Sequence, residues 1–349
     1  MKWGFVGPTL VFLIAFNIFP LFYSIFLSFT DAQMGSEDKK KNIGGENYGK
    51  VLNLVEDEYY QDNLDEYNDY QTKLKKAEIS ILNLEPNSDE YSDLKTQIAD
   101  YKKIEKPPLY EENEYLNSLR VTTLFVFLAV SIELILGFFG AMALRDRYKF
   151  PLKPMIIIAL LVPMLLSPAV MGLFWSNMLS QDTGVINLII SKITGTSTTD
   201  LAQNNMAWNA HWKFASILLV DVWMWTPFMM LICMAGLNSI PNYIYEAAEI
   251  DRASPWTIFR RITLPMSAPL IMLAVLLRIT DAVKQFDLVM TLSNANESST
   301  ATVSTMIYKK IMKQFQVGEG SAYAIVVLVI IIAIATVFTR YIDKIQNRD

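Results

Sequence analysis

Residues 245–265 read YEAAEIDRASPWTIFRRITLP and lie between two long apolar runs, at 214–236 and 266–290. The stretch predicts two short helices joined by a turn. Glu246 and the two alanines after it favour a helix, and Ser254 before Pro255 is typical of the start of the next one. A loop that only joined two apolar runs would not need this ordered pattern. We therefore expect a docking element, with an apolar stripe at Ile258, Phe259 and Ile262.

Apolar runs long enough to cross a bilayer recur on both sides of this loop. An uninterrupted apolar stretch of about 18 residues or more predicts a membrane-spanning helix. A signal peptide is the competing interpretation of the first run, but that run is too long and ends without a small-residue cleavage site. The sequence thus predicts an all-α membrane protein with six spans, at about 5–29, 120–144, 154–178, 214–236, 266–290 and 321–342.

Charge is unevenly distributed along the 349 residues, of which 52% are apolar and 19% charged. Residues 31–118 hold 21 Asp/Glu and 11 Lys/Arg, a net charge of −10, while the rest of the chain carries +5. Lys/Arg excess in short loops marks the cytoplasmic side. The basic groups fall on one predicted side, which places both termini in the cytoplasm and the acidic block outside it: Lys2, Arg145, Arg147, Lys149, Lys153, Arg252, Arg260, Arg261, Arg340, Lys344 and Arg348.

The acidic block predicts an extracytoplasmic helical hairpin between spans one and two. Apolar residues recur at helical spacing on both sides of a break at Glu85-Pro86-Asn87-Ser88, with Asn87 and Glu90 as a loose capping pair. The hairpin at 56–104 is either a solvated spacer with one apolar seam or a docking surface for an extracytoplasmic partner. The expected domains are a first span at 1–30, the insert at 31–118 and a core of five spans at 119–349, with the docking loop at 241–265.

Several function classes are excluded by what the chain contains. The single cysteine, Cys233, cannot form an internal disulfide, and a basic nucleic-acid-binding face is missing. No G-x-x-x-x-G-K-[ST] loop, His-Glu-x-x-His or G-x-S-x-G motif occurs. His211 stands alone, so we expect no metal or catalytic role for it. A membrane-embedded enzyme is therefore disfavoured, and a purely structural anchor does not account for the docking loop.

The docking loop resembles the EAA motif of binding-protein-dependent ABC importer permeases, in particular the carbohydrate branch. The pattern EAA-x-x-D-G-A followed by I-T-L-P matches except at Arg252, where the family usually has glycine. A cation is favourable near a helix C-terminus, which suits this replacement. By this resemblance the residues that couple the chain to an ATPase are Glu246, Ala247, Ala248, Asp251, Arg252, Ala253 and Pro265.

Four further elements, in order, are similar to the same family: 42–48 (NIGGENY), 117–123 (NSLRVTT), 184–187 (GVIN) and 278–287 (RITDAVKQFD). The Gly-Gly-Pro that commonly follows the last of these is replaced by SNAN at 293–296. The resemblance implies the type I ABC importer permease fold in a bacterial cytoplasmic (inner) membrane.

The same resemblance implies a division of labour between subunits. The expected partners are a second homologous permease, two cytoplasmic ABC ATPase subunits, an extracytoplasmic solute-binding protein and the lipid bilayer, with no nucleic acid. ATP is hydrolysed by the partner, so this chain is not an enzyme and binds no cofactor or metal of its own. ATP-driven closure of the partner would switch the spans between inward- and outward-facing states.

The implied cargo is a carbohydrate, and the runner-up is glycerol phosphate or a related polar solute. Aromatic faces stack on sugar rings and polar side chains bind hydroxyls. The resemblance places Asp221, Trp225 and Phe228 of span four, and Asp281 and Lys284 of span five, along the solute pathway. The alternatives are that the tryptophans only pack, and that Asp281 and Lys284 pair with each other. Glu133 is interpreted as a group that hydrogen-bonds between helices.

Overall fold

The computed structural model describes residues 2–35, 40–52, 58–81, 89–101, 114–144, 152–180, 183–203, 208, 212–293 and 298–346. Within these ranges every regular element is a helix, and only two isolated β-bridges occur. Several predicted features lie outside the described residues: the cytoplasmic group at 145–149, the break at 85–88 with Asn87 of the capping pair, His211, residues 294–296 and Arg348. The chain divides into two compact units, 1–117 with 315–323 and 118–314 with 324–349.

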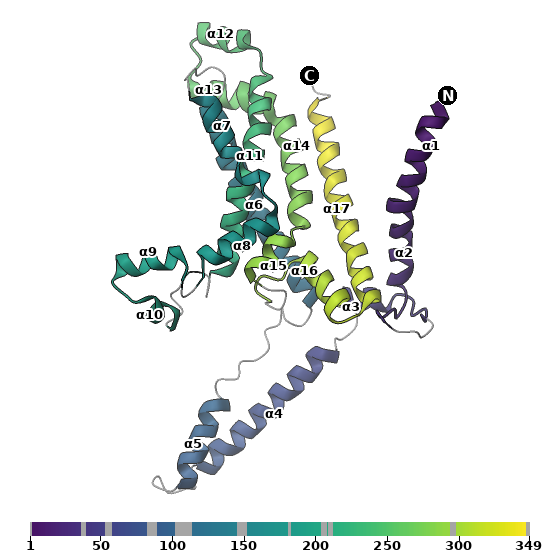
Figure 1. The fold of residues 1–349 in the computed structure, drawn as a ribbon, viewed down its shortest axis with the longest axis vertical. Coiled ribbons are helices and arrows are strands. Elements are labelled where there is room, and N and C mark those ends of the chain that lie inside the picture. The colour runs from purple at the N-terminus through teal and green to yellow at the C-terminus, as the bar shows by residue number, and fades with distance from the viewer. Residues whose placement is uncertain are drawn as a thin grey trace. The chain divides into compact units, whose positions relative to one another are not determined.

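The first unit contains the first span and the insert. Its helices are α1 (Lys2–Leu13), the π-helical turn η1 (Ile14–Ile18), α2 (Phe19–Ser28), α3 (Glu46–Val51), α4 (Glu58–Ile81) and α5 (Asp89–Tyr101). Residues 7–28 are long and apolar enough to cross a membrane. The predicted hairpin is present as two helices that pack side by side, α4 and α5 (Figure 1), with Leu74 and Ala77 buried in the seam. Its placement outside the membrane stays a prediction.

In the first unit, the Asn47 side chain forms hydrogen bonds to the C-terminal end of α2. The Asn47 side-chain amide donates to the carbonyls of Ser28 and Thr30, both at 2.9 Å, and so satisfies carbonyls at the helix end. Gly318 lies against Thr30 so closely that a Cβ atom at 318 would overlap the Thr30 carbonyl. These contacts give a structural reason for the presence of Asn47 in the element at 42–48.

The second unit carries the remaining spans. Its helices are α6 (Glu114–Ala143), α7 (Lys153–Leu161), η2 (Pro163–Leu165), α8 (Pro168–Met178), α9 (Val185–Thr194), α10 (Thr198–Gln203), α11 (Lys213–Asn238), α12 (Asn242–Ile250), α13 (Pro255–Ile258), η3 (Phe259–Thr263), α14 (Leu264–Val283), α15 (Asp287–Ser293), α16 (Val303–Tyr308), η4 (Lys309–Lys313) and α17 (Val317–Gln346). The first residues of α6 and α17 belong to the first unit. Helix α11 packs along α14, and α8 packs on α15.

The number of spans agrees with the sequence, but span three is not straight. Five helices are long and apolar enough to cross a membrane, and a sixth span is obtained if α7–η2 and α8 count as one. These two segments bend by 94° at their junction. The predicted span at 154–178 is therefore built from two helical segments, because Pro168 disfavours a helical conformation at Ser167, which is extended with ψ 138°.

Span five also begins earlier than predicted. One apolar helical stretch runs from Pro255 to Val283, so the second helix of the docking loop, α13, continues through η3 into α14 as a single rod. Pro265 does not end the loop as expected. The π-helical turn η3 directly before it widens the helix, which accommodates a residue that has no N–H to donate.

Candidate functional site

The docking loop begins with α12, which ends in a tight left-handed turn. The Ala253 N–H donates to the Ala248 carbonyl at 2.9 Å, and the Arg252 N–H donates to the Glu249 carbonyl at 3.0 Å. This pair of bonds is the Schellman motif, in which the left-handed position usually carries glycine. Arg252 occupies it with φ 52°, so the turn keeps its geometry at a backbone cost of about 1–2 kcal/mol for the Cβ atom.

The family-implied coupling residues lie on this turn and on the two helices beside it. Glu246, Ala247, Asp251 and Arg252 are exposed, Ala253 is half-buried, and Pro265 is exposed near the start of α14. Ala248 is buried and faces the protein. The Ser254 hydroxyl accepts from the Thr257 N–H at 3.2 Å and caps α13, as the sequence predicted.

The exposed apolar surface of the loop differs from the predicted stripe. Ile258, Phe259 and Ile262 are half-buried, and the Phe259 ring packs edge-on against Phe138 of α6 with centroids 6.0 Å apart. The predicted stripe thus partly anchors the loop to the core.

The side chains that do face outward were missed by sequence reasoning. They are Tyr243, which is 68% exposed, Ile250 at 81% and Trp256 at 66%. Residues 243, 247 and 250 recur at helical spacing and share one face of α12, and this periodicity is the signal that could have identified them. We interpret Tyr243, Ile250 and Trp256 as candidate residues of a contact surface.

Three spans meet at a buried ionic cluster, which consists of Glu133, Asp221, Arg278 and Gln285. Arg278 of α14 is 2% exposed, and its Nε and Nη2 donate to the two oxygens of Glu133 on α6 at 2.8 and 3.0 Å. Arg278 Nη2 also donates to Asp221 of α11. The Gln285 amide donates to the other Asp221 oxygen at 2.9 Å. The interpretation of Glu133 as an interhelical hydrogen-bonding group is confirmed.

Two predicted pathway aromatics line the edge of the cluster. The Arg278 guanidinium carbon lies 5.1 Å from the centroid of the Trp225 ring, within the range of a cation–π contact. The Trp225 ring meets Phe228 edge-on at 6.0 Å, and both residues are half-buried. Asp221 itself is fully buried with both oxygens occupied, so in this conformation it holds α11 to α14.

Asp281 and Lys284 lie at the end of the same rod. Asp281 is in the last turn of α14, Lys284 is its C-terminal capping residue, and both side chains are accessible to solvent. The structure contains no ion pair between these two described residues, so the alternative that they satisfy each other is wrong. A solute contact by any of the five pathway residues stays a prediction.

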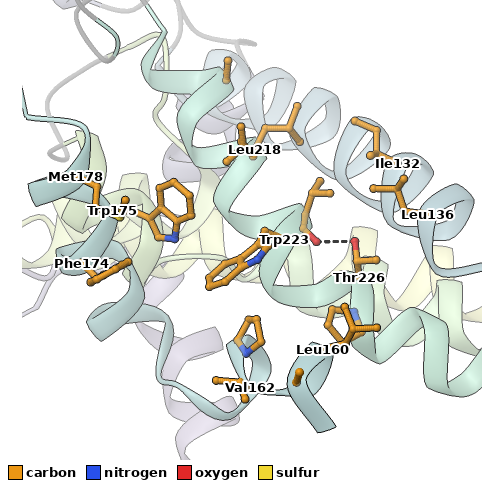
Figure 2. A pocket seen from close by; sticks show the side chains of 16 residues that line it. Ile132, Leu136, Leu160, Val162, Phe174, Trp175, Met178, Leu218, Trp223 and Thr226 are labelled. Atoms are coloured by element: carbon orange, nitrogen blue, oxygen red, sulfur yellow. Dashed lines mark hydrogen bonds between the residues drawn. The ribbon is translucent and has the colours of Figure 1, made fainter. Parts of the chain in front are cut away.

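A cavity of the second unit lies on a different face of α11. It has a volume of about 920 Å³ and is bounded by α6, α7, η2, α8 and α11. Figure 2 shows Trp175 and Trp223 beside it, with rings edge-on at 5.6 Å, and the Thr226 hydroxyl donating to the Val222 carbonyl at 2.6 Å. Its lining is almost entirely apolar, and the side chains in it that carry hydrogen-bonding groups are Trp175, Trp223 and Thr226.

Side chains of the kinds that bind metal ions are not clustered in the described part of the chain. Among those residues no group of three or more His, Cys, Asp or Glu side chains is close enough to hold an ion. Cys233 is buried in the core of the second unit.

Comparisons with known proteins identify relatives of this chain. Residues 133–348 match the family model described as "Binding-protein-dependent transport system inner membrane component". The trehalose/maltose transport system permease protein MalF of Thermococcus litoralis is 33% identical over 229 residues, covering 65% of this chain and 74% of that protein. The trehalose transport system permease protein SugA of Mycobacterium tuberculosis is 29% identical over 223 residues, covering 64% and 68%.

Among solved structures, a bacterial ABC transporter that imports the acidic polysaccharide alginate has the same fold, with a TM-score of 0.67 at 16% identity over 98% of this chain and 95% of that chain. The matched family model covers more than half of the present sequence, including the buried ionic cluster and the docking loop. The resemblance noted in the sequence is confirmed: the chain belongs to the family of binding-protein-dependent transport system inner membrane components, the permease subunits of ABC importers.

Proposed function

We propose that this chain is the permease subunit of an ATP-driven carbohydrate importer, which moves its solute by alternating access and is driven through the docking loop at 241–265. The observation that carries the proposal is the continuous rod from Pro255 to Val283. Its first end lies in the docking loop and its last turns hold Arg278 in the buried ionic cluster. A partner that moves the loop therefore moves the pathway side of the protein, without a flexible joint between them.

The exposed face of the loop supports docking of an ATPase subunit. Ile250 and Trp256 project from the two helices on either side of the left-handed turn, and Glu246 is exposed beside them. Interfaces are enriched in aromatic and aliphatic anchors that fill a pocket in the partner. ATP is bound and hydrolysed in that partner, and two such subunits serve this chain and a second homologous permease.

A carbohydrate fits the pathway better than a phosphate-bearing solute. The alternative, glycerol phosphate, needs free cations, and the sequence offers only Arg278 and Lys284. Arg278 is buried and neutralised by two carboxylates, which leaves Lys284 alone. Trp225 and Phe228 offer ring faces of the kind that stack on sugars. The names of MalF and SugA point to the same class of solute.

The remaining parts of the proposal concern partners and topology. An extracytoplasmic solute-binding protein delivers the cargo. In support, one solved structure is described as a bacterial alginate ABC transporter "in complex with alginate pentasaccharide-bound periplasmic protein". Both termini lie in the cytoplasm and the α4–α5 hairpin lies outside it, consistent with the distribution of charge.

The test is to tag the full-length chain in its native membranes, solubilise gently, and identify by mass spectrometry what co-purifies. We expect a second permease and an ATPase with the unsubstituted chain, and loss of the ATPase with Ile250→Asp combined with Trp256→Asp. Ile79→Asp is the matched control, because Ile79 is 64% exposed on α4 of the insert. An ATPase retained by the double variant, or a chain that purifies alone in several mild detergents, contradicts the coupling.

The solute is tested on the purified complex in proteoliposomes with its binding protein. We expect ATP-dependent uptake of labelled maltose- or trehalose-class sugars and none of glycerol phosphate. The reverse result contradicts the carbohydrate proposal and leaves the coupling proposal standing.

A further inference from the structure

The short helix α9 has an apolar face that the protein core does not cover. Its outward residues are Val185, Leu188, Ile189 and Ile193, and Ile193 is 79% exposed. At 10 residues the helix is about 15 Å long, far too short to cross a bilayer. Figure 1 shows it running across the direction of α11 instead of along it.

The start of α9 is fixed to the end of a membrane span. The Gly184 N–H and the Asn187 side-chain amide both donate to the Ser180 carbonyl, at 3.0 and 2.9 Å. Gly184 is buried so tightly against Ser180 and Met178 that a Cβ atom there would overlap their backbone oxygens. The span segment α8 ends at Met178 and α9 begins at Val185, and these bonds fix the start of α9 to the end of α8.

Two tryptophans and one lysine near α9 are of residue types that are common at the membrane–water interface. The backbone N–H of Trp208 donates to Asn187 Oδ1 at 2.8 Å. The Trp208 and Trp212 rings stack with centroids 5.6 Å apart. Trp212 is exposed and directly precedes α11, the next span. Tryptophan is enriched at the headgroup level of membranes. Lys192 is exposed among the apolar residues of the outward face, and its long stem lets the ammonium reach phosphate while the methylenes stay in an apolar layer.

We propose that α9 is an interfacial helix, whose outward face of Leu188, Ile189 and Ile193 lies in the headgroup–acyl boundary of the lipid bilayer. Its three sides then have three environments. Ile186 and Asn187 contact the protein core, the outward face contacts lipid, and Thr194, which is exposed at the last turn on the side away from the outward face, contacts water. The exposed apolar residues Leu173 and Phe174 of α8 continue the lipid-facing surface. The helix thereby holds the end of the bent span α7–α8 at a fixed depth.

The test places single spin labels on the full-length chain in phospholipid nanodiscs, at Ile189→Cys, Ile193→Cys and, as the matched control, Thr194→Cys. Cys233 is buried, so the unsubstituted chain measures background labelling. Collision of each label with oxygen, which partitions into lipid, is compared with collision with a water-soluble nickel complex.

We expect oxygen to dominate at 189 and 193 and nickel to dominate at 194. Nickel dominance at 189 and 193 would place the face in water and overturn the proposal. Labels at 189 and 193 shielded from both reagents would show that protein covers the face, a second permease or a binding protein, and would overturn it too. Neither outcome depends on the ATPase or on the solute.

Discussion

Replacing Arg278 by glutamine removes the only cation among the four members of the buried ionic cluster. In the native chain one guanidinium faces the carboxylates of Glu133 and Asp221, and all three side chains are at most 2% exposed. The variant leaves the two carboxylates facing each other without a cation. Removing one partner of a buried ion pair costs about 3–5 kcal/mol, because the other charge stays buried and uncompensated.

The carboxylate variants give a graded comparison at the same site. After Glu133→Gln or Asp221→Asn one carboxylate still faces the guanidinium, so we expect a smaller loss of about 1–3 kcal/mol. Arg340→Gln is the control for loss of an arginine, since Arg340 is exposed on α17, and we expect it to stay within about 0.5 kcal/mol of wild type.

The assay is the temperature at which half of the detergent-solubilised chain is lost from its monodisperse size-exclusion peak, with equal heating times. Unfolding of membrane proteins by heat is rarely reversible, so the midpoints are compared only with one another. At about 2–4 °C per kcal/mol for a protein of this size, Arg278→Gln lowers the midpoint by roughly 6–20 °C. A midpoint equal to that of Arg340→Gln, or no lower than that of Glu133→Gln, would refute the charge argument.

Three further changes test other features by the same midpoint. Arg252→Gly removes the Cβ from the left-handed turn and should stabilise the docking loop by about 1 kcal/mol. Gly172→Ala places a Cβ atom onto the Thr291 side chain and should cost about 1–3 kcal/mol by overpacking α8 against α15. Glu319→Ala removes the acceptor that the Tyr115 hydroxyl binds at 2.8 Å and should cost about 1–2 kcal/mol.

Each of these changes has a matched control in the chain. Arg252→Ala keeps the Cβ, so a gain as large as that of glycine would contradict the strain argument. Gly7→Ala adds a Cβ where no atom lies within 4 Å, and a loss equal to that of Gly172→Ala would contradict overpacking. Glu46→Ala removes an exposed carboxylate 3.8 Å from Lys50, and its midpoint should stay at the wild-type value.

The spans and the two-helix docking loop were predictable because each rests on local pattern. Run length identifies a membrane helix without knowledge of its neighbours, and Ser254-Pro255 identifies a helix start. The 94° bend in span three has a local cause as well. The sequence has Pro163 and Pro168 within this span, but prolines that only kink a helix and prolines that break it look alike until the conformation of Ser167 is known.

The candidate site was less accessible to sequence reasoning, because its pairings are made between spans. Glu133, Asp221 and Arg278 are far apart in the chain, and a single sequence does not say which of them meet. The outward face of the docking loop was misassigned for a related reason. Phe259 continues an apolar helical stripe, yet Phe138 of another span covers it, while the isolated Ile250 stays exposed.

The buried ionic cluster also imposes an order on how the protein is made. Glu133 and Asp221 enter the membrane while Arg278 is still in the ribosome or the translocation channel, because it lies 57 residues after Asp221. A charged residue at the centre of a bilayer costs about 2.5–3.5 kcal/mol on insertion scales. Spans two and four are therefore held in the membrane without their counter-ion until span five arrives. A chain that stops before Arg278 carries two unbalanced acids in the bilayer, which gives membrane quality control a physical means of recognising an unfinished permease.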